Sequence, residues 1–160
     1  MIKEIRDLFD DMDFGESCLQ CGALCCFLPW IPKEECDLVS EFQDVVETIG
    51  NVNFFLDRGK CKFVKTGGIC EIYTIRPLDC RLFPLDIIEQ DGRYYWCFYT
   101  ICPTLSAMKN LLETRIQAIE QRISEALWHQ FKEQIEISKE IYEPYKNKQY
   151  SIICEVNKSW

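Results

Sequence analysis

Eleven cysteines dominate the chemistry that this 160-residue sequence offers. Ten of them lie between residues 18 and 102, and the densest group is Cys18-x2-Cys21-x3-Cys25-Cys26. The two-residue spacing between Cys18 and Cys21 lets both sulfurs turn toward one metal ion, and thiolates are the ligands of structural zinc and of iron–sulfur clusters. Four thiols in so short a segment exceed what a hydrophobic core requires. The group therefore predicts a metal site.

A disulfide framework is the alternative explanation for so many cysteines, and three features disfavour it. The first residues lack the apolar stretch of a signal peptide, so we expect a cytoplasmic protein whose thiols stay reduced. The cysteine count is odd, which would leave one thiol unpaired. The neighbours Cys25 and Cys26 have Cα atoms about 3.8 Å apart, which is closer than the usual disulfide range of about 4.4–6.8 Å. Metal ligands are the better prediction.

A second set of thiols follows among basic residues and comprises Cys61, Cys70 and Cys80. Cations beside a thiol favour its ionised form and stabilise a negatively charged thiolate centre. Arg76 and Arg81 are the stronger candidates for this role, because a guanidinium can hold several acceptors at once. For Lys60 and Lys62, a solvated surface charge is an equal alternative. The second set is thus predicted to belong to the same kind of site.

The second set also carries a long motif. Residues 70–84 read Cys-Glu-Ile-Tyr-Thr-Ile-Arg-Pro-Leu-Asp-Cys-Arg-Leu-Phe-Pro, and Cys102-Pro103 follows. Together with the first group, this pattern resembles the zinc- or iron-chelating cysteine-cluster domains, often called the YkgJ type, over residues 18–103. The sequence departs from the family's Cys-x2-Cys-x2-Cys-Cys run by one extra residue before Cys25. The resemblance implies eight metal ligands: Cys18, Cys21, Cys25, Cys26, Cys61, Cys70, Cys80 and Cys102.

The number and type of metal centres stay open at this point. Eight sulfurs suit two four-sulfur centres, and one centre with additional free thiols is the alternative. Only one Cys-x2-Cys knuckle is present, whereas zinc sites often use repeated ones. Iron–sulfur clusters are held by cysteines alone, often with one in a Cys-Pro dipeptide, which favours a 4Fe–4S cluster over Zn²⁺. Both cofactors remain candidates.

The other thiols and the single imidazole are weaker candidates for ligands. Cys36 lies in a helical pattern and is predicted to be a small buried apolar residue. Cys97 lies on an aromatic strand, and the sequence does not decide whether it is a metal ligand or a core residue. Cys154 is predicted to be an ordinary thiol, and His129 a partly buried helix residue.

The elements that must position the first thiols are predicted to be short. Apolar residues at three- and four-residue spacing predict a helix over 2–13, and a loop with the first cysteines follows. Pro32 opens a second helix as a first-turn proline, and Gly50 is its expected C-terminal stop. Residues 53–56 and 61–64 read as strands, and residues 71–84, with two prolines, as irregular chain with at most one helical turn.

The C-terminal part is more regular. Asp91-Gly92 predicts a hairpin between strands 85–90 and 93–99. Residues 104–143 lack Gly and Pro and keep an apolar three- or four-residue spacing, which amounts to about 60 Å of helix. Because so small a body cannot cover that length, we expect a break, a helical pair, or a helix that binds a protein partner. The tail from residue 145 contains a possible edge strand at 150–156.

These elements predict an α+β fold. We expect one domain over residues 1–160, with a small irregular metal-centred core at 18–103, short strands and a hairpin, N-terminal helices, a helical extension at 104–143 and a tail at 144–160. The first 57 residues hold 13 acidic and 3 basic side chains, and no dense basic stripe occurs. Nucleic acid is therefore not an expected partner. The sequence also lacks the roughly 18 apolar residues of a membrane span.

Three function classes fit these features. The first is a metal-binding cysteine-cluster module with a structural or regulatory role, and the second is an iron–sulfur redox or electron-transfer protein. The third is a methyltransferase-like enzyme, since the resemblance extends to flagellin lysine methylases. The enzyme is disfavoured because no cofactor-binding loop, nucleophile elbow or Cys–His pair is visible.

Overall fold

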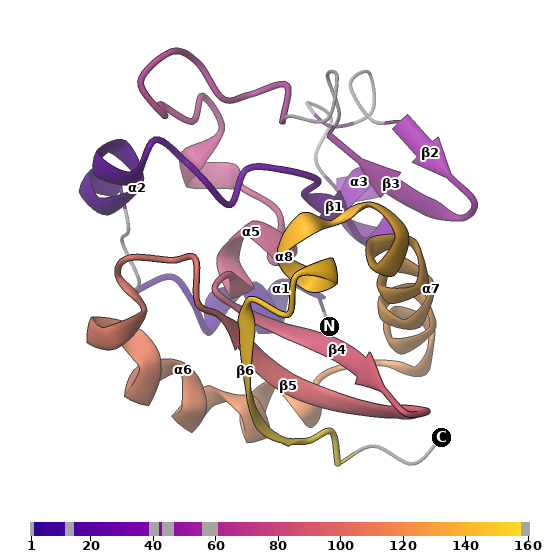
Figure 1. The fold of residues 1–160 in the computed structure, drawn as a ribbon. Coiled ribbons are helices and arrows are strands. Elements are labelled where there is room, and N and C mark those ends of the chain that lie inside the picture. Colours follow the sequence, from indigo (N-terminus) through magenta and orange to yellow (C-terminus); the bar gives the residue numbers. More distant parts are fainter. Residues whose placement is uncertain (1, 12–14, 39–41, 43–46, 56–60, 158–160) are drawn as a thin grey trace.

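Short helices and two antiparallel sheets alternate along the chain, which confirms the predicted α+β fold class (Figure 1). The structure is a computed structural model and describes residues 2–11, 15–38, 42, 47–55 and 61–157. No helix within these residues is long and apolar enough to span a membrane. The strand orders are β1-β3-β2 and β4-β5-β6.

The first sheet corrects the predicted second helix. It consists of β1 (Trp30–Ile31), β2 (Glu47–Ile49) and β3 (Val52–Phe54). The helix that begins after Pro32 is α3 (Lys33–Leu38), and the helix prediction is wrong for residues 47–49. Ile49 pairs with Val52 around a two-residue turn in which Gly50 has a φ of +63°. A glycine with positive φ serves a hairpin turn as well as a helix end, so the sequence signal was ambiguous.

The second sheet matches the prediction closely. Strands β4 (Leu85–Gln90) and β5 (Arg93–Tyr99) form the predicted hairpin, and β6 (Tyr150–Glu155) is the predicted edge strand beside β5. Asp91 and Gly92 both have positive φ, at +53° and +78°. Such a turn matches the natural twist of the strands, which explains why the Asp-Gly pair located it correctly.

The long helical pattern breaks into two helices, as one of the alternatives foresaw. These are α6 (Leu105–Glu120) and α7 (Glu125–Ile141), and the hydroxyl of Ser124 caps α7 by accepting the Leu127 N–H. Figure 1 shows α6 below the second sheet and α7 beside β4. The apolar stripes of both helices are buried in the main core. Pro144 lies in the following short helix, α8 (Glu143–Lys146).

The segments that carry the cysteines contain more helix than expected. The predicted helix 2–13 is α1 (Ile2–Asp7) followed by turns to residue 11, and residues 12–14 lie outside the described part. The predicted loop is wrong at its start, because α2 (Gly15–Cys21) is helical. Residues 61–64 form only an isolated bridge, from Val64 to Cys70. Residues 71–84 contain η1 (Tyr73–Ile75) and α5 (Leu78–Leu82), slightly more helix than predicted.

Two hydrophobic clusters make up the core. The larger one joins α1, the second sheet, α6 and α7. The smaller one contains Ile31, Phe42, Phe55 and Ile72 together with Cys36, which confirms Cys36 as a buried apolar residue. The cysteine-bearing loops contribute Cys61 and Ile72 to the smaller cluster. These loops have few regular elements of their own (Figure 1).

Candidate metal centre

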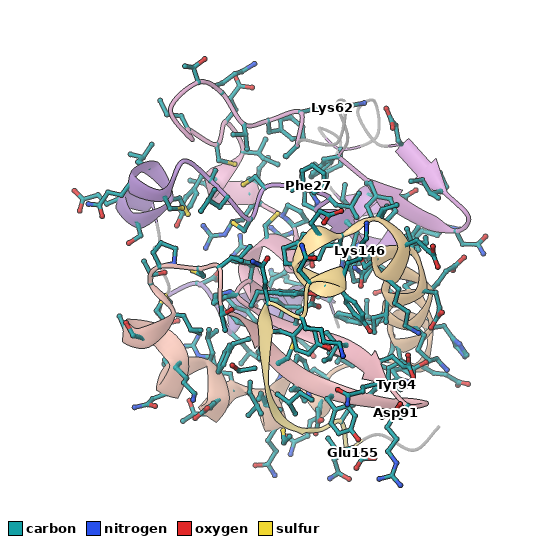
Figure 2. All side chains as sticks on the ribbon, in the orientation of Figure 1. Phe27, Lys62, Asp91, Tyr94, Lys146 and Glu155 are labelled. Atoms are coloured by element: carbon teal, nitrogen blue, oxygen red, sulfur yellow. The ribbon has the colours of Figure 1, made fainter. Side chains whose placement is uncertain are left out.

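All eight cysteines that the resemblance implies as ligands line one cavity of about 270 Å³. Its walls come from α2, the chain after it, the segment 61–76, α5 and residues 101–104, which precede α6. Figure 2 shows the sulfur atoms gathered beside α2. The volume is close to the lower end of the range of about 300–1,000 Å³ that is typical of ligand pockets. Thiols that are far apart in sequence thus meet around one space.

Helix α2 places the first two thiols. Cys18 and Cys21 are three residues apart and therefore lie on one helix face, and the Cys21 thiol lies 3.5 Å from the Cys18 carbonyl oxygen. Gly22 and Ala23 then adopt left-handed φ angles of +66° and +55°, and the Ala23 N–H donates to Cys18. This turn accommodates the extra residue before Cys25 and directs the chain back toward the cavity.

The second set of thiols is tied to the first through the backbone. The Cys61 N–H donates to the Cys26 carbonyl at 3.1 Å. The bridge between Val64 and Cys70 closes a small loop that turns at Gly67 and Gly68. Cys80 lies in α5. The two sets are therefore held together by main-chain contacts as well as by any metal.

The two arginines have different roles. Arg76 is buried, lines the cavity and places its guanidinium 4.1 Å above the ring of Tyr73. Arg81 does not line the cavity. Its side chain donates to the carbonyls of Thr74 and Arg76 and pairs with Asp10 at 2.9 Å. Arg76 therefore supplies the charge beside the thiols, whereas Arg81 fixes the chain that carries it.

Lys62, the one of the two lysines that the structure describes, gives no support to a role at the thiols. Lys62 pairs with Glu47 at 3.7 Å and does not line the cavity. Lys60 lies outside the described residues.

Burial opposes ionisation of most of these thiols when no metal is bound. It raises the pKa of Cys18 to about 11 and the pKa of Cys61 to about 12. The pKa of Cys26 is lowered instead, because the Cys25 thiol donates a hydrogen bond to it and Arg76 lies nearby. Cys26 is thus the first thiolate that a metal would meet, and the others must lose protons as a metal binds.

The thiols form two neighbourhoods that meet at the Cys25–Cys26 pair. Three thiols act electrostatically on Cys18, namely Cys21, Cys26 and Cys102. Those that act on Cys80 are Cys26, Cys61 and Cys70. Cys25 interacts with members of both groups, Cys18 and Cys80. The Cys25–Cys26 pair therefore interacts with both groups of thiols.

The remaining candidates lie elsewhere. Cys97 is fully buried in β5 and does not line the cavity. Cys36 belongs to the smaller core cluster, and Cys154 is exposed on β6. His129 is exposed on α7, 3.9 Å from Glu125, and is not the partly buried residue predicted for it.

Four polar residues that line the cavity were not singled out from the sequence: Ser17, Tyr73, Asp79 and Thr104. The Arg76 guanidinium lies over the ring of Tyr73, and the hydroxyl of Thr104 lies 3.2 Å from the Cys102 sulfur. Asp79 accepts the Trp30 N–H at 3.2 Å and lines the same wall. Only their positions beside Cys18, Cys80, Cys102 and Arg76 could have suggested them.

The donor set fits a soft, thiolate-binding metal or cluster. All eleven thiols are free, and the cavity is lined by eight of them and by no imidazole. Within the described residues, no three His, Cys, Asp or Glu side chains are already arranged so that they could hold a metal ion. Cysteine sulfur selects zinc, copper(I) and iron–sulfur clusters rather than magnesium or calcium.

Comparison with known proteins agrees with this donor set. A family model described as "CxxCxxCC: Putative zinc- or iron-chelating domain" matches residues 17–103. No curated protein and no solved structure matches the chain. The matched segment contains all eight thiols of the cavity and spans more than half of the sequence. The chain belongs to the CxxCxxCC family of zinc- or iron-chelating domains.

Proposed function

We propose that the protein holds iron–sulfur clusters of the 4Fe–4S type in the cysteine-lined cavity. The observation that carries the proposal is that eight thiols without an imidazole surround one space of about 270 Å³. A structural zinc site is closed around a single ion by four ligands, with sulfurs at about 2.3 Å. A cluster of several iron and sulfide atoms needs more room, and cysteines alone hold it.

The eight thiols would be shared between two centres. Cys18, Cys21 and Cys102 would hold one, and Cys61, Cys70 and Cys80 the other. Each would be completed by one thiol of the Cys25–Cys26 pair, whose adjacent side chains interact with both groups. Arg76 would offset part of the negative charge of the thiolates, since its charge already opposes the rise in the pKa of Cys18 and Cys70 and helps to lower the pKa of Cys26.

The role that we propose for these centres is electron transfer. A bound iron–sulfur cluster supplies a one-electron couple. Electron transfer requires a centre near the surface, and the cavity has half-exposed thiols and an exposed rim residue, Leu24. A structural module is the second candidate, because the cysteine-bearing loops have little regular structure and a metal would hold them together. Methyl transfer has no supporting feature in the described residues.

The location and a partner are parts of the same proposal. Eleven free thiols suit a reducing compartment such as the cytoplasm. A protein partner would reach the helical segment at Leu111 of α6 or at Ile141 of α7, which are the exposed large apolar residues of these two helices.

The test is purification without oxygen, followed by an absorption spectrum and by iron, sulfide and zinc analysis of the same sample. A brown protein with equal amounts of iron and sulfide, and a reversible one-electron signal in electron paramagnetic resonance, is the expected result. A brown protein without a reversible couple would support iron–sulfur but overturn electron transfer. A colourless protein with stoichiometric zinc would overturn both and leave the structural module.

A further inference from the structure

A second, smaller cavity lies next to the cysteine-lined one. Its volume is about 30 Å³, and it shares Cys25 and Asp79 with the larger cavity. A space of this size holds one water molecule or one ion. Its other polar lining residues come from β4, β5 and the C-terminal helical region: Asp86, Tyr99, Gln134, Ser138 and Tyr142.

Two carboxyl groups face this cavity without a counter-charge. Asp79 and Asp86 interact with each other, and no Lys, Arg or His side chain lines the cavity. Glu35, another acidic residue, also acts on Asp79. The carboxyl oxygens accept hydrogen bonds from the Trp30 N–H at 3.2 Å, from the Ile87 N–H at 2.7 Å and from the Tyr99 hydroxyl. None of these three donors carries a positive charge.

A third oxygen in the cavity wall has no donor. Gln134 is 5% exposed, and its amide nitrogen donates to Ser138. Its Oε1 is buried and has no hydrogen-bond partner among the described residues. A buried carbonyl is almost always paired with a protein group, a water molecule or an ion. The amide oxygen therefore points independently to an occupant of the cavity that accepts electron pairs.

We propose that the small cavity binds one hard divalent cation, of the Mg²⁺ or Mn²⁺ kind, through the carboxylates of Asp79 and Asp86 and the amide oxygen of Gln134. Carboxylate, amide and hydroxyl oxygens are the ligands that such cations prefer. Buried carboxylates are normally paired with a cation or coordinated to a metal. This site uses oxygen donors, whereas the neighbouring cavity uses sulfur, so the two would take different metals.

The electrostatics of Asp86 agree with a missing positive charge. Burial raises the pKa of Asp86 to about 7. A bound cation would lower it again. It would also place positive charge beside Cys25, which lines the same cavity.

The test is a titration of the full-length, metal-loaded protein with Mn²⁺, in which the free ion is followed by electron paramagnetic resonance. We expect one Mn²⁺ per chain that excess Mg²⁺ displaces. Asp86→Asn and Gln134→Leu should each weaken binding by at least about tenfold. Asp91→Asn is the matched control, because it removes the same charge at the exposed hairpin turn, far from the cavity (Figure 2). It should bind as the unchanged protein does.

Two further measurements make the result decisive. The first uses Cys70→Ser, which alters only the larger cavity. If Cys70→Ser loses the Mn²⁺ site and Asp86→Asn keeps it, Mn²⁺ binds to the thiols and the proposal is overturned. The unchanged protein is informative by itself if a variant fails to fold. Absence of Mn²⁺ binding, together with an infrared band of a protonated carboxyl group, would mean that the two aspartates share a proton instead.

Discussion

Gly68 lies so close to Gly22 that a Cβ atom at Gly68 would stand 3.0 Å from the Gly22 Cα. Gly22 belongs to the turn after α2, and Gly68 to the loop between Cys61 and Cys70. Both have positive φ. This contact of two backbones sets the distance between the two thiol-bearing segments. It requires a residue without a side chain at position 68, whereas a Cβ atom at position 22 would meet no atom within 4 Å.

Gly68→Ala is therefore expected to lower both metal content and stability. The methyl group meets main-chain atoms, which cannot move aside as a flexible side chain would, and crowding of this kind costs about 1–3 kcal/mol. The left-handed φ adds about 1–2 kcal/mol. Metal analysis and urea unfolding measure the two effects.

Gly67→Ala separates the contact from the backbone strain. Gly67 has a φ of +83°, close to the +81° of Gly68, but a Cβ atom there has no neighbour within 4 Å. Gly67→Ala should show the strain alone and keep its metal. Equal metal loss in both variants would refute a specific role of the Gly68–Gly22 contact.

Substitution of cavity thiols tests the ligand assignment. Cys21→Ser and Cys80→Ser should each reduce bound metal and destabilise the fold, because a structural metal contributes roughly 10–16 kcal/mol to folding. Cys154→Ser is the control, since this thiol is exposed on β6 and far from the cavity wall. Full metal content in both cavity variants would exclude Cys21 and Cys80 as ligands.

Arg76 should set the pH at which the metal loads. Its charge offsets part of the rise that burial causes in the pKa of Cys18 and Cys70, and it contributes to the lowered pKa of Cys26. Its removal should therefore leave these thiols protonated to higher pH. Because ligands must be deprotonated, Arg76→Met should move the midpoint of metal loading upward by as much as about one pH unit. The measurement is metal content after reconstitution across a pH series.

Arg93→Met is the matched control for this series. Arg93 is exposed in β5 and pairs with Glu155 at 3.6 Å, away from the cavity. Its loading midpoint should equal that of the unchanged protein. An unchanged midpoint in Arg76→Met would contradict a role of its charge and leave only its packing on Tyr73.

The candidate ligands could be identified from the sequence because thiol chemistry depends on residue type and local spacing. Cys18 and Cys21 are recognisable whether their segment is a loop or, as found, helix α2. The β4–β5 hairpin was equally accessible, since Asp91-Gly92 specifies its turn without any tertiary contact.

The parts that could not be predicted depend on contacts between distant segments. Gly50 is compatible with a helix end and with a hairpin turn, and the pairing of β2 with β3 decides between them. Arg81 is bound by carbonyls and by Asp10, which lies 71 residues away. The small cavity depends on Asp86 and Gln134, and no local spacing relates a residue of β4 to one of α7.

Glu35 is expected to make the free energy of unfolding depend on pH, and this effect can be measured separately from the contribution of a bound metal. Its side chain is fully buried, and Oε2 accepts the Leu78 N–H at 2.8 Å. The Arg6 guanidinium lies 3.2 Å from Oε1 but makes no hydrogen bond to it. Burial outweighs both partners and raises the pKa of Glu35 from 4.5 to about 7.

This shift predicts stability that is lost as pH rises. Between pH 4.5 and about 7 the folded protein holds a proton that the unfolded chain has released, so the contribution is complete below 4.5 and disappears as pH passes 7. Its size is on the order of 3 kcal/mol.

Glu35→Gln stays neutral, so the unchanged protein should lose stability relative to this variant between pH 5 and pH 8. Urea unfolding of both metal-loaded proteins cancels the metal contribution, and Glu34→Gln, on the same helix, should follow the unchanged protein. A stability difference that is equal at both pH values would mean that Glu35 is ionised throughout, with Arg6 as an effective counter-charge.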